Sequence, residues 1–152
     1  MFRGINTLKL DPKGRMVMPT RYRELLQQQT EGQVVVTIDT EATCLLLYPL
    51  SEWVVIEQKL AQLPSFNSAA RRIQRLLLGH ATEIEMDMNG RVLLPPPLRD
   101  YAGLHKQAVL IGQGKKFEIW DEQQWNAGRE RWLKDSAEDL DALPDDLKLL
   151  SL

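Results

Sequence analysis

A duplicated string constrains the fold of this chain more than any other feature of its sequence. The string reads D-x-x-G-R-x-x-x-P-x-x-x-R; its first copy starts at Asp11 and its second at Asp87. Every matched pair is separated by the same offset, and self-similarity at a fixed offset indicates repeated structural units. We therefore expect two similar halves. The matched pairs are Asp11 and Asp87, Gly14 and Gly90, Arg15 and Arg91, Pro19 and Pro95, and Arg23 and Arg99.

Each copy contains the residues of a tight turn between two strands. Residues 11–14, Asp-Pro-Lys-Gly, have proline where a type I turn requires a negative φ and glycine where a positive φ follows. Residues 87–90, Asp-Met-Asn-Gly, fit the same turn, because asparagine tolerates turn geometry. Apolar and polar residues alternate on both sides, which predicts a strand–turn–strand unit with one buried face. The expected buried residues are Leu8, Leu10, Met16 and Met18 in the first copy and Ile84, Met86, Val92 and Leu94 in the second.

The segments that follow each turn also correspond between the halves. Nearly continuous apolar runs predict buried strands, and apolar residues at helical spacing predict helices. We expect Thr20 to cap the first helix, Ser51 to begin the second, and Gly103 to close a short helix in the second half. The fold class predicted is α+β, mainly β. The expected strands are 34–38, 44–48, 108–111 and 117–120, and the expected helices are 20–29, 51–63, 69–79, 97–102 and one that opens at Asp121.

Composition and charge narrow the class of function. The chain has 152 residues, of which 43% are hydrophobic, and no apolar run has the ~18 residues that a membrane span needs. A single cysteine, Cys44, excludes an internal disulfide and fits a reducing cytoplasm. Residues 1–23 carry a net charge of +5, whereas residues 134–152 carry −4. This asymmetry predicts a polyanion-binding end and an acidic tail. Together with the duplicated string, it divides the chain into two expected repeats, 1–66 and 67–133, and a tail at 134–152.

The basic residues around the turns are the candidate nucleic-acid site. An arginine beside a stiff turn, such as Arg15 or Arg91, can offer a planar donor fork to guanine O6 and N7. Asp11 and Asp87 are then expected to orient these arginines, with Gly14 and Gly90 shaping the turns. An exposed ion pair without function is the alternative for one copy, and we favour a DNA role because the pair occurs twice. The remaining candidates for DNA contact, mainly to phosphates, are Lys13, Lys9, Arg3 and Asn89.

Several longer strings support a family resemblance that covers residues 1 to about 133. They are Met-Phe-Arg-Gly at residues 1–4, Asp-Pro-Lys-Gly-Arg at 11–15, Pro-Thr-Arg-Tyr-Arg at 19–23, Leu-Leu-Leu-Tyr-Pro-Leu at 45–50 with Trp53, Arg-Leu-Leu-Leu-Gly-His at 75–80, and Asp-Met-Asn-Gly-Arg at 87–91. The duplicated turn resembles the swapped-hairpin barrel of AbrB-type bacterial transcription factors, and the full chain is similar to the MraZ family.

The resemblance implies a fold, an assembly and a target. It implies a pseudo-two-fold β-barrel of two interlocked hairpins with short flanking helices, assembled as a homo-oligomeric ring. It also implies binding to short direct repeats of double-stranded DNA, in the promoter of the bacterial division and cell-wall gene cluster, as a repressor. Such a protein is cytoplasmic and associated with the nucleoid, with no cofactor, metal, membrane or small-molecule ligand. The family's D-x-x-x-R signature falls on Asp11 with Arg15 and on Asp87 with Arg91.

Two other classes of function are weighed against DNA binding. An enzyme needs converging nucleophiles, bases or metal ligands, and the spacing of His80, His105 and Cys44 is not that of a metal or thiol site. Asp11 and Asp87 can pair in principle as catalytic carboxylates, but each already has a role in its turn. The stronger rival is an antitoxin-like protein-binding module, in which the acidic, leucine-bearing tail captures a partner.

Overall fold

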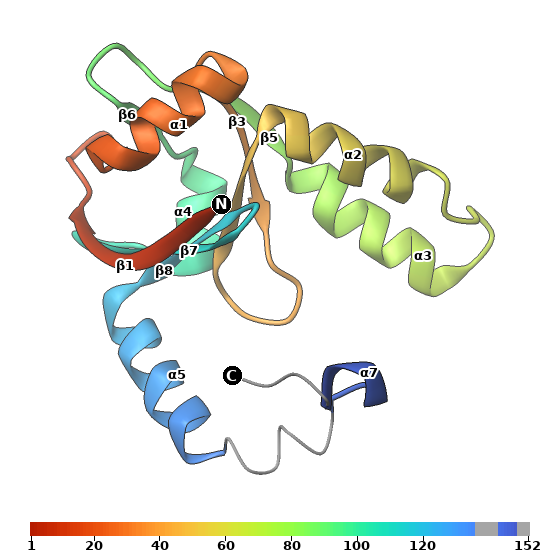
Figure 1. The fold of residues 1–152 in the computed structure, drawn as a ribbon. Helices are drawn as coiled ribbons and strands as arrows, with labels where there is room; N and C mark the ends of the chain where they lie inside the picture. Colours follow the sequence, from red (N-terminus) through yellow and green to blue (C-terminus); the bar gives the residue numbers. More distant parts are fainter. Residues whose placement is uncertain (136–142, 149–152) are drawn as a thin grey trace. The chain divides into compact units, whose positions relative to one another are not determined.

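The structure of this chain is a computed structural model that describes residues 1–135 and 143–148. It forms two compact units, Met1–Glu122 and Gln123–Leu152, and both predicted turns lie in the first. Strands dominate the first unit, so the fold class is α+β and mainly β, as predicted (Figure 1). Residues 136–142 and 149–152 of the predicted acidic tail lie outside the described residues.

The larger of two sheets has six antiparallel strands. Its order is β1-β7-β8-β4-β3-β5, and each strand pairs only with antiparallel neighbours. Two hairpins, β3–β4 and β7–β8, meet at its centre through β4 and β8. The strands are β1 (Phe2–Lys9), β3 (Gln33–Ile38), β4 (Leu45–Pro49), β5 (Thr82–Glu85), β7 (Gln107–Gly114) and β8 (Phe117–Asp121).

The smaller sheet is a ribbon of two short strands, β2 (Arg15–Val17) and β6 (Arg91–Leu93). When each strand is exchanged for its counterpart in the other repeat (β1 for β5, β2 for β6, β3 for β7 and β4 for β8), the same strands remain neighbours in both sheets, and the order is simply read from the opposite edge. The register of the ribbon obeys the same exchange, with Met16 opposite Val92 at its centre. The two repeats are therefore arranged with pseudo-two-fold symmetry at the level of strand pairing.

The two arms of each predicted hairpin do not form a ladder with each other. β1 pairs with β7 and β2 pairs with β6, so each arm finds its partner in the other repeat. The turns themselves are confirmed, and so are the expected buried faces, although Leu8 and Ile84 are only partly buried.

The six-stranded sheet is open, with β1 and β5 as its edges, and strand pairing among the described residues does not close the expected barrel.

Equivalent short helices follow β2 and β6. They are α1 (Thr20–Thr30) and α4 (Pro96–Ala102). Thr20 is the first helical residue and makes no side-chain cap, so its predicted capping role is wrong; Pro19 takes the cap position. Gly103 ends α4 with a φ of 63°, as predicted.

The first repeat has two further helical segments. They are α2 (Leu50–Ala61), which begins one residue before Ser51, and α3 (Ser68–Ile73), which continues into a π-helical turn, η1 (Gln74–Leu78). The predicted helix at 69–79 is therefore present, but residues 74–78 are π-helical and not α-helical. The buried hydroxyl of Thr37 donates a hydrogen bond of 2.7 Å to the Leu77 carbonyl, which satisfies an acceptor in this irregular turn.

The core of the first unit consists of two apolar clusters. The larger contains both ribbon-centre residues, Met16 and Val92, together with the inner faces of the sheet and of α1 and α4. The smaller lies beneath α2 and centres on Trp53 and Tyr48. Cys44 is fully buried, as expected for a residue of the predicted buried strand 44–48.

The second unit contains the remaining helices, α5 (Glu122–Lys134), which begins at the boundary, and α7 (Asp145–Lys148). Within α5, the rings of Trp125 and Trp132 lie 5.6 Å apart between centroids, and Gly128 leaves room for the Trp132 ring. Among the described residues, every helix is too short or too polar to cross a bilayer.

Candidate nucleic-acid interface

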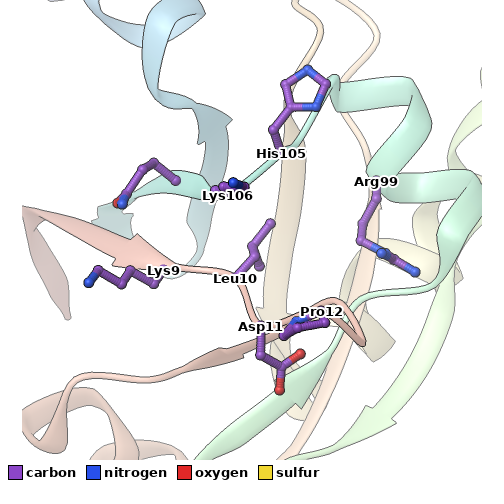
Figure 2. A pocket seen from close by; sticks show the side chains of 8 residues that line it. Lys9, Leu10, Asp11, Pro12, Arg99, His105 and Lys106 are labelled. Carbon is purple, nitrogen blue, oxygen red and sulfur yellow. The ribbon is translucent and has the colours of Figure 1, made fainter.

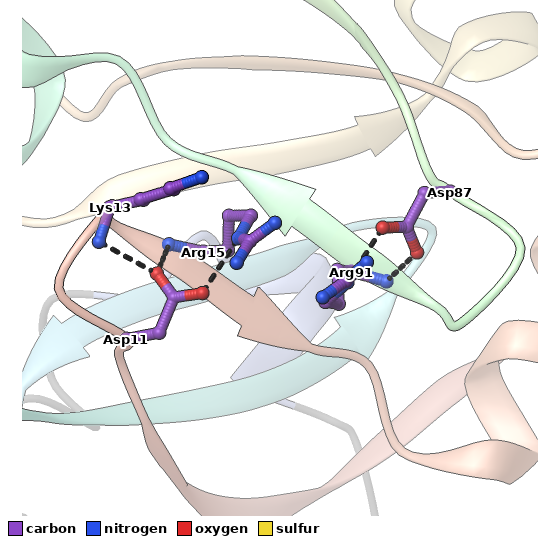
Figure 3. Close-up of polar contacts among 5 residues, drawn as sticks. All are labelled: Asp11, Lys13, Arg15, Asp87 and Arg91. Atoms are coloured by element: carbon purple, nitrogen blue, oxygen red, sulfur yellow. Dashed lines mark hydrogen bonds and ion pairs between the residues drawn. The ribbon is translucent and has the colours of Figure 1, made fainter.

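The first turn is held by one carboxylate that accepts three hydrogen bonds. Asp11 Oδ1 accepts from the backbone N–H groups of Lys13 at 2.9 Å and Arg15 at 2.8 Å. Asp11 Oδ2 accepts from Arg15 Nε at 2.6 Å, which makes an ion pair (Figure 3). The backbone closes the turn as well, because the Asp11 N–H donates to the Arg15 carbonyl at 3.0 Å. Asp11 therefore fixes both the turn and the guanidinium.

The second turn repeats this arrangement at equivalent atoms. Asp87 Oδ1 accepts from the backbone N–H groups of Asn89 at 2.9 Å and Arg91 at 2.8 Å, and Oδ2 accepts from Arg91 Nε at 2.7 Å. In the described part of the chain, the terminal Nη groups of Arg15 and Arg91 donate no hydrogen bond. Each arginine is thus oriented through Nε and keeps its two terminal amino groups available.

The carboxylates of both turns are stabilised in the ionised form. The backbone N–H of Arg15, and then its side chain, hold the pKa of Asp11 below its ordinary value, and Arg91 does the same for the pKa of Asp87. Hydrogen bonds to a charged carboxylate favour the charged form. Both ion pairs are therefore present at neutral pH.

The ribbon brings the two turns together. Arg15 lies opposite Leu93 and Arg91 lies opposite Val17, so both arginines are on the same face. Beyond the ribbon, the Met18 N–H donates to the Gly90 carbonyl at 2.8 Å. Its counterpart, the Leu94 N–H, donates to the Gly14 carbonyl at 3.0 Å.

Two helix arginines brace these turns across the repeats. Arg99 of α4 lies against Gly14 of the first turn, and Arg23 of α1 lies against Gly90 of the second. Arg99 Nε donates to the Leu94 carbonyl at 2.9 Å, and Arg23 Nη2 donates to the Met18 carbonyl at 3.2 Å. The sequence identified both as a matched pair of the duplicated string. It did not predict that each one contacts the turn of the opposite repeat.

The first turn borders a cavity of about 580 Å³ that is lined by basic residues (Figure 2). The exposed side chains of Lys9, Lys106 and His105 lie along it, and Arg99 lines it beside the turn. Since Asp11 is committed to Arg15, the net charge along this cavity is positive. The sequence did not predict Lys106 and His105 as site residues, because only tertiary structure brings them beside the first turn, where the Leu10 N–H donates to the Lys106 carbonyl at 2.9 Å.

The cavity beside the second turn is smaller, about 400 Å³, and less basic. Arg23 lines it together with Glu24, and its remaining lining residues are Gln27, Met86, Asp87 and Met88. The two turns therefore share their hydrogen bonds but not their electrostatic surroundings.

The other predicted residues differ in their distance from the turns. Lys13 and Asn89 are exposed at equivalent tip positions, and Lys9 ends β1 just before the first turn. Arg3 is exposed near the start of β1, roughly 20 Å of strand away from Lys9 at about 3.3 Å per residue. Lys9, Lys13 and Arg15 thus lie in the first turn or next to it, and Arg3 lies apart from it.

One cluster away from the turns contains side chains of the metal-ligating types. Ligand atoms of Asp39, Cys44 and Glu118 lie within 4.8 Å of one another. Burial raises the pKa of the Cys44 thiol, and its Sγ is 3.6 Å from Asp39 Oδ2. A protonated thiol is a poor nucleophile, and Cys44 is accounted for as a buried hydrogen-bond donor to Asp39.

The duplication and its geometry agree with comparisons to known proteins. A family model described as "MraZ protein, putative antitoxin-like" matches residues 1–76 and again residues 77–145. Proteins named "Transcriptional regulator MraZ" are 57% identical in Legionella pneumophila, 55% in Coxiella burnetii and 53% in Halorhodospira halophila, with 100% of both chains covered in each case. The resemblance expected from the sequence is thus confirmed, and the chain belongs to the MraZ family.

Proposed function

We propose that this chain is a sequence-specific DNA-binding transcriptional regulator and not an enzyme. The observation that carries the proposal is the pair of oriented arginines on one face of a two-stranded ribbon. The major groove of B-DNA admits such a ribbon. The names of the relatives support the same class of function.

Arg15 and Arg91 are proposed to read guanine. Each guanidinium is held through Nε by a neighbouring aspartate, so its Nη groups can donate to O6 and N7 without losing much side-chain entropy. Asp11 and Asp87 act as orienting residues, since a direct contact with phosphate would be repulsive. Gly14 and Gly90 allow the positive φ that the turns require.

The lysines around the first turn are proposed to contact phosphates. Lys13 lies at the tip of this turn, and Lys9 and Lys106 line the cavity beside it. Arg3 lies farther along β1 and is proposed to reach a more distant phosphate, while Asn89 contacts the backbone without adding charge. Contacts of this kind set register and affinity and do not read sequence.

The finer parts of the proposal come from the family resemblance. We propose a repressor that binds short direct repeats in the promoter of the division and cell-wall gene cluster, in the cytoplasm and at the nucleoid. One chain carries one ribbon, so several direct repeats require several copies, which fits a ring-shaped homo-oligomer. The cross-repeat pairing of β1 and β2 supports a swapped-hairpin barrel built from repeats 1–66 and 67–133.

Footprinting of the purified protein on that promoter at two salt concentrations tests the proposal. We expect protected direct repeats for the wild type and loss of protection for the double variant Arg15→Ala, Arg91→Ala. Arg71→Ala, which removes an exposed arginine of α3, is the matched control and should protect like the wild type. Equal protection by the double variant would refute the site, and no protection by the wild type would refute the function.

The antitoxin-like description of the family favours a second candidate, capture of a protein partner by the acidic tail. Deletion of residues 134–152 separates the two. DNA protection should survive the deletion if the ribbon alone binds DNA. Loss of a co-purifying partner on deletion, with no DNA protection by the full chain, would favour the rival.

A further inference from the structure

The outer face of the β2–β6 ribbon carries two exposed aliphatic side chains. Val17 is 46% exposed and Leu93 is 50% exposed, whereas Met16 and Val92 on the inner face are fully buried. The inner pair packs into the core. Core packing therefore explains the inner residues and leaves Val17 and Leu93 without a role in the fold.

The register places each aliphatic side chain directly across from an arginine. Val17 lies opposite Arg91, and Leu93 lies opposite Arg15. Residues at this spacing have Cβ atoms about 4.5–5.5 Å apart, and alternate residues of one strand share a face. The outer face is thus a compact square in which two arginines and two aliphatic side chains alternate.

We infer that Val17 and Leu93 contact the 5-methyl groups of thymines that adjoin the guanines read by Arg91 and Arg15. The inference rests on the proposed function and deepens it by naming a sequence class. Thymine methyls are the apolar groups that the major groove presents to a protein. The pair Arg15 and Leu93 would then recognise one guanine with a neighbouring thymine, and the pair Arg91 and Val17 would recognise a second.

The charge of the same face argues for DNA as the occupant. An apolar partner surface that covered Val17 and Leu93 would also bury the terminal Nη groups of Arg15 and Arg91, which donate to no acceptor among the described residues, and a buried donor without an acceptor costs free energy. A DNA groove satisfies both requirements at once, since guanine accepts from the arginines and thymine methyls meet the aliphatic side chains.

Deoxyuridine substitution tests the inference on the wild-type protein. Each thymine of a footprinted repeat is replaced in turn by deoxyuridine, which removes only the 5-methyl group, and the Kd is measured. Loss of one buried methyl contact should weaken binding about fourfold. We expect this loss at one or two positions, next to the guanines whose contacts depend on Arg15 or Arg91.

Variants assign each methyl to a side chain. Val17→Ala and Leu93→Ala should bind the thymine site more weakly, and each should be indifferent to deoxyuridine at one position. Val55→Ala, which truncates an α2 side chain that is 49% exposed, is the matched control and should respond to deoxyuridine like the wild type. Thermal melting of each variant checks that the fold is retained.

The outcomes separate this inference from the proposed function. Wild-type binding that needs Arg15 but tolerates deoxyuridine everywhere would overturn the inference and leave the proposed function standing. A change of oligomeric state in Val17→Ala or Leu93→Ala, with unchanged deoxyuridine sensitivity, would show that another copy covers this face. Absence of any promoter binding by the wild type would remove the proposed function itself.

Discussion

The first and second turns have the same internal hydrogen bonds but different neighbours. In each turn an aspartate accepts two backbone N–H groups and one arginine Nε. The first turn has Lys13 at its tip and a basic cavity beside it, whereas the second has Asn89 at its tip and Glu24 nearby. The comparison indicates that the oriented arginine is duplicated, while positive charge is concentrated at the first turn.

The two bracing arginines differ as well. Arg99 Nε, beside the first turn, has an acceptor in the Leu94 carbonyl. Arg23 Nε, beside the second turn, is buried without a hydrogen-bond partner among the described residues. An unsatisfied buried donor costs free energy. The second turn is therefore held less favourably, and we expect the first turn to be the stronger DNA contact.

The largest expected effect is on specific binding when an arginine is removed. Arg15→Ala and Arg91→Ala should each cost about 1–3 kcal/mol in promoter binding, because each removes one of the proposed bidentate guanine contacts. Arg15→Ala should cost more, because the basic neighbours draw the first turn closer to the DNA. Mobility-shift titrations on promoter and unrelated DNA measure this, and equal losses on both DNAs would contradict base reading.

Substitution of the turn glycines should reduce stability in both repeats. Gly14 and Gly90 have φ values of 86° and 76°, and an added Cβ would meet Arg99 or Arg23. Gly14→Ala and Gly90→Ala should each lower the free energy of unfolding by about 1–3 kcal/mol. Gly79→Ala is the control, since Gly79 is helical and open space surrounds its Cβ position. Chemical denaturation measures all three, and a neutral Gly14→Ala would disprove the strain argument.

Changes at the turn tips should act on all DNA sequences alike. Lys13→Ala should reduce the slope of log K against log salt by about one, because it removes one phosphate contact. Asn89→Ala should leave the slope unchanged, and Asn89→Lys should raise it by about one if the second tip also approaches the backbone. A series of titrations at different salt concentrations tests this, and no response to Asn89→Lys would place the second tip away from phosphate.

The smallest expected difference between the turns is in their titration. The pKa of each aspartate is lowered by the folded structure, so each ion pair stabilises the fold above the ordinary carboxyl pKa of 3.8 and loses this effect as the pH falls through the lowered value. The amide proton shifts of Arg15 and Arg91, followed by NMR, should change together below about pH 4. A transition in only one turn would show that the carboxylates are not equivalent.

The local parts of the fold could be predicted from the sequence because their causes are local. Proline and glycine at defined positions specify the turns, and alternation specifies the buried residues around Met16 and Val92. The π-helical turn could not be predicted, because the hydroxyl that satisfies it belongs to Thr37 of a distant strand. The pairing of β1 with β7 was missed for the same reason, since either arm could have paired with its neighbour.

The candidate site also has a part that the local sequence predicts and a part that depends on distant residues. Spacing alone identified Asp11 with Arg15 and Asp87 with Arg91, because a turn brings residues four apart into contact. Pairing of strands from different repeats put both arginines on one ribbon, placed Arg99 and Arg23 behind the opposite turns, and exposed Val17 and Leu93. Local sequence determined each arginine-bearing turn, and long-range strand pairing determined how the two turns act together, because pairing energy depends on partners that local sequence does not specify.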